Sequence, residues 1–269
     1  MEPLVAVVIL AAAVCAFCLI ASVITHEHSW VDRLWSIVPV AYVWIFAGFD
    51  GLQDPRLVIM AVLVTLWGAR LTFNFARKGG YTGTEDYRWA VLRGRMKRWQ
   101  FEVFNVLFIV VWQNAILVLI SLAAFTAYEN RDTPLGPLDV VVAIVFLALL
   151  AAETIADQQQ WDFHAAKAAG TTPARFLTSG LWRYSRHPNF FFEQAQWWVL
   201  FLFGAIAAGS LAQWTVVGPV LLTLLFVGST RFTESITLSK YPEYADYQAV
   251  TSAIVPLPPR SSHAARAAA

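Results

Sequence analysis

LVAVVILAAAVCAFCLIASVIT, residues 4–25, is a run of 22 residues without a charged side chain. About 20 apolar residues are enough for an α-helix to cross the hydrocarbon core of a bilayer. The run is too long for the core of a signal peptide and lacks a basic leader, so we expect a retained membrane span. The 269-residue chain is 58% hydrophobic and 14% charged, with a mean hydropathy of +0.56. This balance is far from that of soluble domains and predicts a membrane protein.

Further apolar blocks follow the first one and are separated by polar loops. The predicted spans are 4–25, 34–49, 56–76, 103–127, 137–156, 190–208 and 214–236. The second block is short and contains Pro39, so it is the least regular of the set. We therefore expect an all-α fold, a polytopic bundle of about seven transmembrane helices. It forms one transmembrane domain over residues 1–258, and the Pro- and Ala-rich residues 259–269 form a disordered tail.

The basic residues are unevenly distributed among the loops. They concentrate between the third and fourth spans and between the fifth and sixth, and the opposite loops carry few. The positive-inside rule places the rich loops and the carboxyl terminus in the cytoplasm, and seven spans then leave the amino terminus outside. The net charge of +1 favours no nucleic-acid partner, and no obligate protein partner is evident.

Polar residues gather on the side predicted to be cytoplasmic. The stretch GLWRYSRHPNFFFE, residues 180–193, leads from a basic loop into an apolar span and carries Asn189 and Glu193. Glu153 and Asp157 are four residues apart and share one helix face at the end of the fifth span. Amides and carboxylates at the mouth of a membrane helix are costly, so they indicate a functional site.

Several basic residues accompany this group, and they could hold a phosphorylated ligand, since guanidinium groups match phosphate oxygens. They are Lys167, Arg175, Arg183, Arg186 and Arg231. The alternative is that they only set the topology and contact anionic lipid. No glycine-rich phosphate loop is present, because Gly79, Gly80 and Gly83 follow no predicted strand.

Two further groups contain the residue types of metal or redox sites. Cys15 and Cys18 lie inside the first apolar run, where the polar neighbours of such a site are missing. His26 and His28 lie beside Asp32 without a third histidine on the loop. We predict no metal site.

The order of these motifs is similar to that of a known superfamily. GLWRYSRHPNF at 180–190, Glu193, YPEYADY at 241–247 and VP at 255–256 resemble the steroid 5-alpha-reductase superfamily. The closest similarity is to its bacterial branch of uncharacterised membrane proteins, which carry Asp-Tyr-Arg as at 86–88. The resemblance covers residues 30–258 and is strongest over 153–258. Isoprenylcysteine carboxyl methyltransferases share the Arg-His-Pro loop and the closing segment, so the region leaves NADPH and S-adenosylmethionine open.

The resemblance implies an NADPH site. Asn189 and Glu193 match a pair that contacts the nicotinamide portion, and Arg175 matches a phosphate-binding arginine. Asp157 and Glu153 resemble residues that hold the adenosine part, although Glu153 departs from the steroid-reducing members. The full expected cofactor set is Glu153, Asp157, Lys167, Arg175, Tyr184, Arg186, His187, Asn189, Glu193, Arg231, Glu234 and Tyr244.

The substrate half of the resemblance is incomplete. Steroid-reducing members carry a glutamate in the second span and a tyrosine in the third. Here the nearest acid is Asp32, and Trp67 takes the tyrosine position. An indole donates a hydrogen bond but does not transfer a proton usefully. The candidate catalytic residues are therefore Asp32, Tyr87 and Trp67, with Tyr87 or a protonated Asp32 as the hydrogen-bond donor.

These features together predict a membrane oxidoreductase that acts on CH–CH groups. It would use NADPH to reduce an activated C=C bond in a lipophilic substrate, sterol-, terpenoid- or enone-like, that enters from the membrane lipid. We expect a bacterial inner-membrane location. The alternatives are an S-adenosylmethionine-dependent membrane methyltransferase and a non-catalytic lipid-binding bundle.

Overall fold

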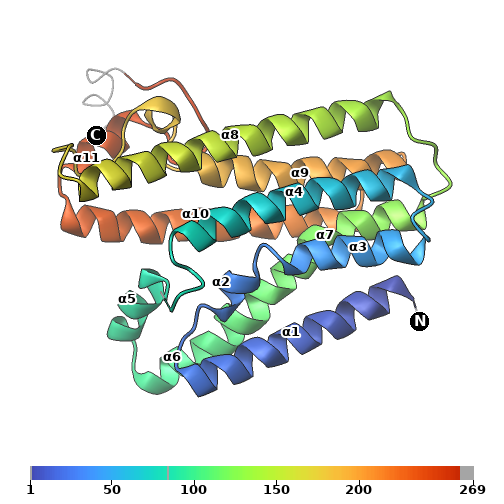
Figure 1. Ribbon diagram of the computed structural model, residues 1–269, viewed down its shortest axis with the longest axis horizontal. Coiled ribbons are helices and arrows are strands. Elements are labelled where there is room, and N and C mark those ends of the chain that lie inside the picture. Colours follow the sequence, from blue (N-terminus) through green and yellow to red (C-terminus); the bar gives the residue numbers. More distant parts are fainter. Residues whose placement is uncertain (1, 84, 261–269) are drawn as a thin grey trace. The chain divides into compact units, whose positions relative to one another are not determined.

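The structure is a computed structural model that describes residues 2–83 and 85–260 (Figure 1). Over these residues it contains helices and turns, and its one β-type pairing is an isolated bridge between Ser185 and Ser252. The predicted all-α class is confirmed. Residues 261–269, most of the predicted disordered tail, lie outside the described residues.

Six of the described helices are long and apolar enough to cross a membrane. They are Pro3–Thr25, Pro55–Arg77, Arg98–Glu129, Pro137–Ala168, Pro188–Ala207 and Trp214–Lys240. The chain is therefore a multi-pass membrane protein, as the apolar blocks predict. The third of these spans joins three elements, α6 (Arg98–Phe104), the π-helix η1 (Asn105–Trp112) and α7 (Gln113–Glu129).

The remaining predicted span, 34–49, is not a full-length helix. It is divided between α2 (Trp30–Leu34) and α3 (Val38–Phe49), and Pro39 lies in the first turn of α3. A twelve-residue helix is shorter than the roughly 20 residues that cross a bilayer core. α8 (Pro137–Ala168) differs in the opposite sense, because it continues well beyond the predicted end at residue 156. Its extension, 157–168, is polar and is rich in good helix formers such as glutamine and alanine.

The chain forms two compact units. Unit 1 comprises Met1–Phe146 and Trp198–Leu222, and unit 2 comprises Leu147–Trp197 and Thr223–Ala269. α8, α9 (Pro188–Ala207) and α10 (Val217–Lys240) each contribute to both units.

Unit 1 is built from closely packed helices. α3 packs against α4 (Pro55–Arg77) and α7, and α1 (Pro3–Thr25) packs against α3 and α7. Gly68 of α4 allows the close approach, because a Cβ there would overlap the Ser36 carbonyl oxygen and the Val40 side chain. Small residues have this role in membrane helix packing, where backbones must come close to gain dispersion energy.

A fully buried ion pair joins the starts of α4 and α8 within unit 1. Arg56 Nε donates to Asp139 Oδ1 at 2.7 Å, and Arg56 Nη2 donates to Asp139 Oδ2 at 3.0 Å. Two backbone carbonyls, of Thr133 and Pro134, take the remaining guanidinium contacts at 3.0 Å each. Both charges are therefore fully compensated, as burial of an ion pair requires.

Unit 2 contains the loop that the sequence singled out. The loop forms a short 3-10 helix, η2 (Gly180–Arg183), and leads into α9 at Pro188. A following segment, from α11 (Tyr244–Val250) to Arg260, folds back onto it, at the end of unit 2 where α8 ends (Figure 1). The Leu257 amide donates to the Tyr184 carbonyl at 2.9 Å, and the Arg186 amide donates to the Ser252 carbonyl at 2.8 Å.

Candidate functional site

The core of the candidate site is a double amide–carboxylate pairing between α8 and α9. Asn189 Nδ2 donates to Asp157 Oδ1 at 3.2 Å, and Gln196 Nε2 donates to Glu153 Oε2 at 2.6 Å. Glu153 is 1% exposed, Asp157 3% and Glu193 8%. The structure thus brings together four of the residues predicted from the sequence, Glu153, Asp157, Asn189 and Glu193, on two facing helices.

Helical spacing explains how these side chains meet. Glu153 and Asp157 lie one turn apart on α8, and Asn189 and Glu193 lie one turn apart on α9. Pro188 starts α9 immediately before Asn189, a position that proline favours because its missing N–H is not needed there. Asn189 is therefore held in the first turn of the helix, opposite Asp157.

Two acceptor atoms of this arrangement have no protein partner. Asn189 Oδ1 and Gln196 Oε1 are buried and accept no hydrogen bond. An unsatisfied buried acceptor costs about 1–3 kcal/mol. The side chains that hold the carboxylates therefore leave two buried carbonyl oxygens without a hydrogen-bond donor from the described part of the chain.

A second network in unit 2 fastens the loop to α10 and α11. Arg186 Nε and Nη2 donate to the two carboxylate oxygens of Glu234 at 2.6 and 2.9 Å. Arg186 Nη1 donates to the carbonyls of Gln248 and Thr251. Burial alone would lower the pKa of Arg186, but the hydrogen bonds and the charge of Glu234 raise it. Arg186 thus uses most of its donors inside the protein.

Glu234 is also held by its other neighbours. His187 Nε2 lies 3.1 Å from Oε1, the Tyr244 hydroxyl donates to Oε1 at 3.3 Å, and Gln248 Nε2 donates to Oε2 at 2.9 Å. Four predicted cofactor-binding residues, Arg186, His187, Glu234 and Tyr244, are therefore bound to one another in this conformation. In this conformation they connect the loop between η2 and α9 to α10 and α11.

The other predicted basic residues lie at the surface of unit 2. Lys167 Nζ donates to the Arg175 carbonyl at 3.0 Å and lies 3.3 Å from the Tyr241 hydroxyl. Arg175 forms an exposed ion pair with Glu243 at 3.0 Å. Arg231 is exposed on α10. Exposed ion pairs are weak, so these cations can exchange their present partners for a phosphate at little cost.

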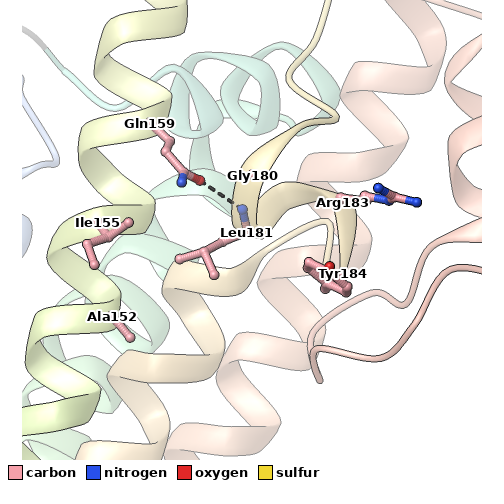
Figure 2. A pocket seen from close by; sticks show the side chains of 7 residues that line it. All are labelled: Ala152, Ile155, Gln159, Gly180, Leu181, Arg183 and Tyr184. Atoms are coloured by element: carbon pink, nitrogen blue, oxygen red, sulfur yellow. Dashed lines mark hydrogen bonds between the residues drawn. The ribbon is translucent and has the colours of Figure 1, made fainter.

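An open pocket of about 440 Å³ lies between α8 and the η2 loop (Figure 2). The Leu181 amide donates to Gln159 Oε1 at 2.9 Å across its floor. Gly180 has a positive φ of 62°, and a Cβ there would overlap Gln159. Arg183 points away from α8 in this view, whereas Ile155 and Ala152 present an apolar wall. The complete lining is Ala152, Ile155, Gln159, Gly180, Leu181, Arg183 and Tyr184.

The predicted catalytic residues all belong to unit 1. Asp32 accepts a hydrogen bond from Trp89 Nε1 at 3.1 Å, and burial together with the nearby Asp86 carboxylate raises the pKa of Asp32. Tyr87 is 51% exposed at the start of α5 (Tyr87–Arg95), and Trp67 is fully buried in α4. A raised pKa is a property that a proton-donating aspartate needs, and the donor role of Asp32 stays a prediction.

Sequence reasoning missed three glutamines, Gln159, Gln196 and Gln248. Gln196 was recognisable, because it is an amide inside an apolar span and lies three residues after Glu193. Gln159 and Gln248 carried no comparable signal, since they lie in polar segments. Among residues 2–83 and 85–260, no three His, Cys, Asp or Glu side chains are grouped to hold a metal ion.

Comparisons with known proteins bear on these findings. The sequence profile of the family described as "Protein of unknown function (DUF1295)" matches residues 17–251. A relative from Schizosaccharomyces pombe, "Uncharacterized protein C594.04c", is 40% identical over an alignment of 247 residues, and the match covers 84% of this chain and 72% of the relative. No solved structure matches. The chain therefore belongs to the family of proteins of unknown function DUF1295, which lies within the steroid 5-alpha-reductase-like superfamily.

Proposed function

We propose that this protein is a membrane-embedded, NADPH-dependent reductase of an activated C=C bond in a lipophilic substrate. The observation that carries the proposal is the pair of buried, unpartnered amide oxygens beside buried carboxylates, Asn189 Oδ1 and Gln196 Oε1. A dinucleotide presents a carboxamide NH₂ and ribose hydroxyls, which are donors that match such acceptors. NADPH, when bound, would supply the hydride.

The chain's own residues have distinct roles in this proposal. Asn189 is oriented by Asp157, which accepts one N–H of its NH₂ group, so that its oxygen would be presented to the ligand. The Glu153 carboxylate orients Gln196 in the same way. Because both amides are fixed before the ligand arrives, little side-chain entropy remains to be lost on binding.

The exposed basic residues of unit 2 supply charge for the phosphates. Arg183 and Arg231 form no ion pair within the described part of the chain, and Arg175 and Lys167 are only weakly engaged. NADPH carries an additional phosphate that NADH lacks, so these residues would favour it.

We also propose an orientation in the membrane and a hydrogen-bond donor for the substrate oxygen. We place the amino terminus outside a bacterial inner membrane and the carboxyl terminus in the cytoplasm, as the distribution of Lys and Arg indicates. Termini on opposite sides require an odd number of crossings, so α2 and α3 together would have to form a seventh crossing beside the six long helices. The substrate would enter from the surrounding lipid, and a protonated Asp32 or Tyr87 would donate a hydrogen bond to its oxygen as negative charge develops there.

One observation favours a second candidate. Three buried carboxylates, Glu153, Asp157 and Glu193, lie on two facing helices, and negative charge there suits a cationic ligand. The sulfonium of S-adenosylmethionine is such a cation, so a methyltransferase of the isoprenylcysteine carboxyl type is the alternative.

Ligand-induced thermal stabilisation separates these functions. A ligand at one hundred times its dissociation constant adds about 2.7 kcal/mol to the stability of the protein that binds it. We expect NADPH to raise the melting temperature of the purified protein more than NADH does, and S-adenosylmethionine to leave it unchanged. A shift with S-adenosylmethionine alone would favour the methyltransferase, and no shift with any of the three would favour the lipid-binding bundle.

Variants then test the position of the site. Asn189→Leu removes the oxygen proposed to accept from the ligand and should abolish the NADPH shift. Asp162→Asn is the matched control, because Asp162 is exposed on the same helix as Asp157 and contacts Gln158. A full NADPH shift in Asn189→Leu would show that the cofactor binds elsewhere.

A further inference from the structure

A tight turn between α5 and α6 carries the densest group of cations in the chain. Arg93, Arg95, Lys97 and Arg98 fall within six residues, with no acidic residue among them. All four are exposed. α5 ends at Arg95 and α6 begins at Arg98, so Met96 and Lys97 make the turn (Figure 1). We call residues 93–98 the basic turn.

The basic turn is held in place by contacts on its inner side. Trp89 of α5 and Phe101 of α6 belong to one buried apolar cluster. The guanidinium carbon of Arg93 lies 5.3 Å from the centre of the Phe101 ring. At the start of α6, the Lys97 amide donates to Gln100 Oε1 at 2.9 Å. The two short helices are therefore packed against each other, and the cations between them are left on the outside.

The basic turn lies at the beginning of a membrane span. The apolar helical span Arg98–Glu129 starts within it. Trp99, Val103 and Leu107 follow at intervals of four residues and are 64%, 47% and 61% exposed. We call these three residues the apolar stripe. At the rise of an α-helix they extend over about 12 Å, which approaches the hydrocarbon depth of one leaflet, about 15 Å. Tryptophan is common at the membrane–water boundary, so Trp99 marks the headgroup end of the stripe.

Membrane topology alone does not account for this arrangement. The positive-inside rule requires positive charge in a cytoplasmic loop, but it does not depend on how the side chains are placed. Here the cations lie on one turn that is fixed by packing, and an exposed apolar stripe begins at the same point. A ligand that contacts both needs an anionic group joined to an apolar chain.

We propose that the basic turn and the apolar stripe bind an anionic phospholipid of the surrounding bilayer. Ammonium and guanidinium groups only donate hydrogen bonds, and they match the oxygens of a phosphate. Because Arg93 also pairs with Glu85, the phosphate would lie among Arg95, Lys97 and Arg98, and an acyl chain would run along the apolar stripe. Phosphatidylcholine fits less well, since its choline group brings a positive charge to the cations. The site uses no residue of the proposed cofactor site and needs no nicotinamide.

Lipid contact with Trp99 can be measured directly, because bromine atoms on an acyl chain quench tryptophan fluorescence. The full-length protein would be placed in phosphatidylcholine nanodiscs that contain a small fraction of brominated phosphatidylglycerol or of brominated phosphatidylcholine. The chain has 12 tryptophans, so the contribution of Trp99 is the difference between the wild type and Trp99→Phe. Each cation near an anionic lipid strengthens the attraction by about fivefold. We therefore expect half-maximal quenching at a phosphatidylglycerol fraction at least about tenfold below that of phosphatidylcholine.

Variants of the basic turn separate charge from structure. The triple variant Arg95→Gln, Lys97→Gln and Arg98→Gln removes three charges and keeps polar side chains. It should reduce the preference for phosphatidylglycerol to less than about threefold. The double variant Arg95→Lys and Arg98→Lys keeps the charge and should keep the preference.

A second control matches the loss of charge at other places. Arg131→Gln, Lys240→Gln and Arg260→Gln together remove three exposed charges outside the basic turn, and this variant should keep the preference. In the wild-type protein the preference should also shrink with added salt, because the Debye length falls from about 10 Å at 0.1 M to about 3 Å at 1 M. That measurement needs no variant to fold.

Three outcomes would overturn the proposal. The first is that the two brominated lipids quench Trp99 alike in the wild-type protein. The second is that the triple variant of the basic turn keeps the wild-type preference, or that the charge-matched control loses it to the same extent, which would assign the preference to the net charge of the chain. The third is that glycerol phosphate, which has no acyl chain, abolishes the quenching by phosphatidylglycerol and so marks a site for soluble phosphates. None of these results depends on the proposed reductase function.

Discussion

Replacing Arg186 by methionine tests whether one side chain holds the loop of unit 2 in place. Arg186→Met keeps the length of the side chain and removes its donors to Glu234, Gln248 and Thr251. The Glu234 carboxylate would remain buried without its countercharge. Removing one partner of a buried pair costs about 3–5 kcal/mol. The side chains of the pair are 10% and 9% exposed, so we expect little screening and a loss within that range.

The remaining contacts of Glu234 determine how strongly the effects of substituting Arg186 and Glu234 depend on each other. Glu234→Gln removes the charge but keeps a side chain that His187, Tyr244 and Gln248 can still contact, so its cost should be smaller, about 1.5–3 kcal/mol. The double variant should lose less than the sum of the two single losses, with a coupling energy of about 2 kcal/mol.

Unfolding in mixed detergent micelles measures these free energies, and limited proteolysis of residues 241–260 reports whether that segment is released. Arg231→Met is the matched control, since Arg231 is exposed on α10 and surface substitutions change stability by about 0.5 kcal/mol or less. A loss below about 1 kcal/mol for Arg186→Met, with the segment still protected, would refute the assigned role of Arg186.

Three further predictions concern unit 1. Arg56→Met should lower the free energy of unfolding by about 3–5 kcal/mol, because Asp139 stays buried without its partner. Adding Asp139→Asn to this variant should restore part of the loss, and no restoration in the double variant would contradict the pairing. Since the pKa of Asp32 is raised in the folded protein, its ionisation weakens folding as pH rises above the ordinary aspartate range. Asp32→Asn should therefore raise the melting temperature at pH 7 but not near pH 3, below the ordinary pKa of about 3.9, and an equal change at both would disprove this. Burial alone would raise the pKa of Glu85, but the Arg93 hydrogen bond helps to lower it. The stabilisation by Glu85 should be full above about pH 5 and lost as pH falls through the lowered pKa, so a wild-type advantage over Glu85→Gln that persists at pH 2 would argue against it.

The sequence predicted the features that depend on composition and helical spacing. The long spans follow from the length of apolar blocks, because a bilayer sets the number of residues that a helix needs. The pairing of α8 and α9 was foreseen in part, since Glu153, Asp157, Asn189 and Glu193 stand one turn apart in two pairs.

Other features depend on contacts between distant residues or on small energy differences. Arg186 and Glu234 are 48 residues apart, and nothing in the local sequence distinguishes an arginine that pairs within the protein from one that binds phosphate. The π-helix at Asn105–Trp112 is apolar, as is most of the α-helix that follows it, so composition does not distinguish the two windings. The polar extension of α8 beyond residue 156 is stabilised by helix propensity rather than by the membrane, so hydropathy does not reveal it.

The dependence of the η2 loop on later residues has a consequence for biosynthesis. Arg186 takes one of its carbonyl partners from Thr251, 65 residues further along the chain. At about 5–20 residues per second, the ribosome needs roughly 3–13 s to make that stretch. During this interval the loop is already synthesised but cannot adopt its final form. We therefore expect a chain truncated before residue 251 to keep its apolar helices but to have a loop that proteases cleave more readily than in the full-length protein.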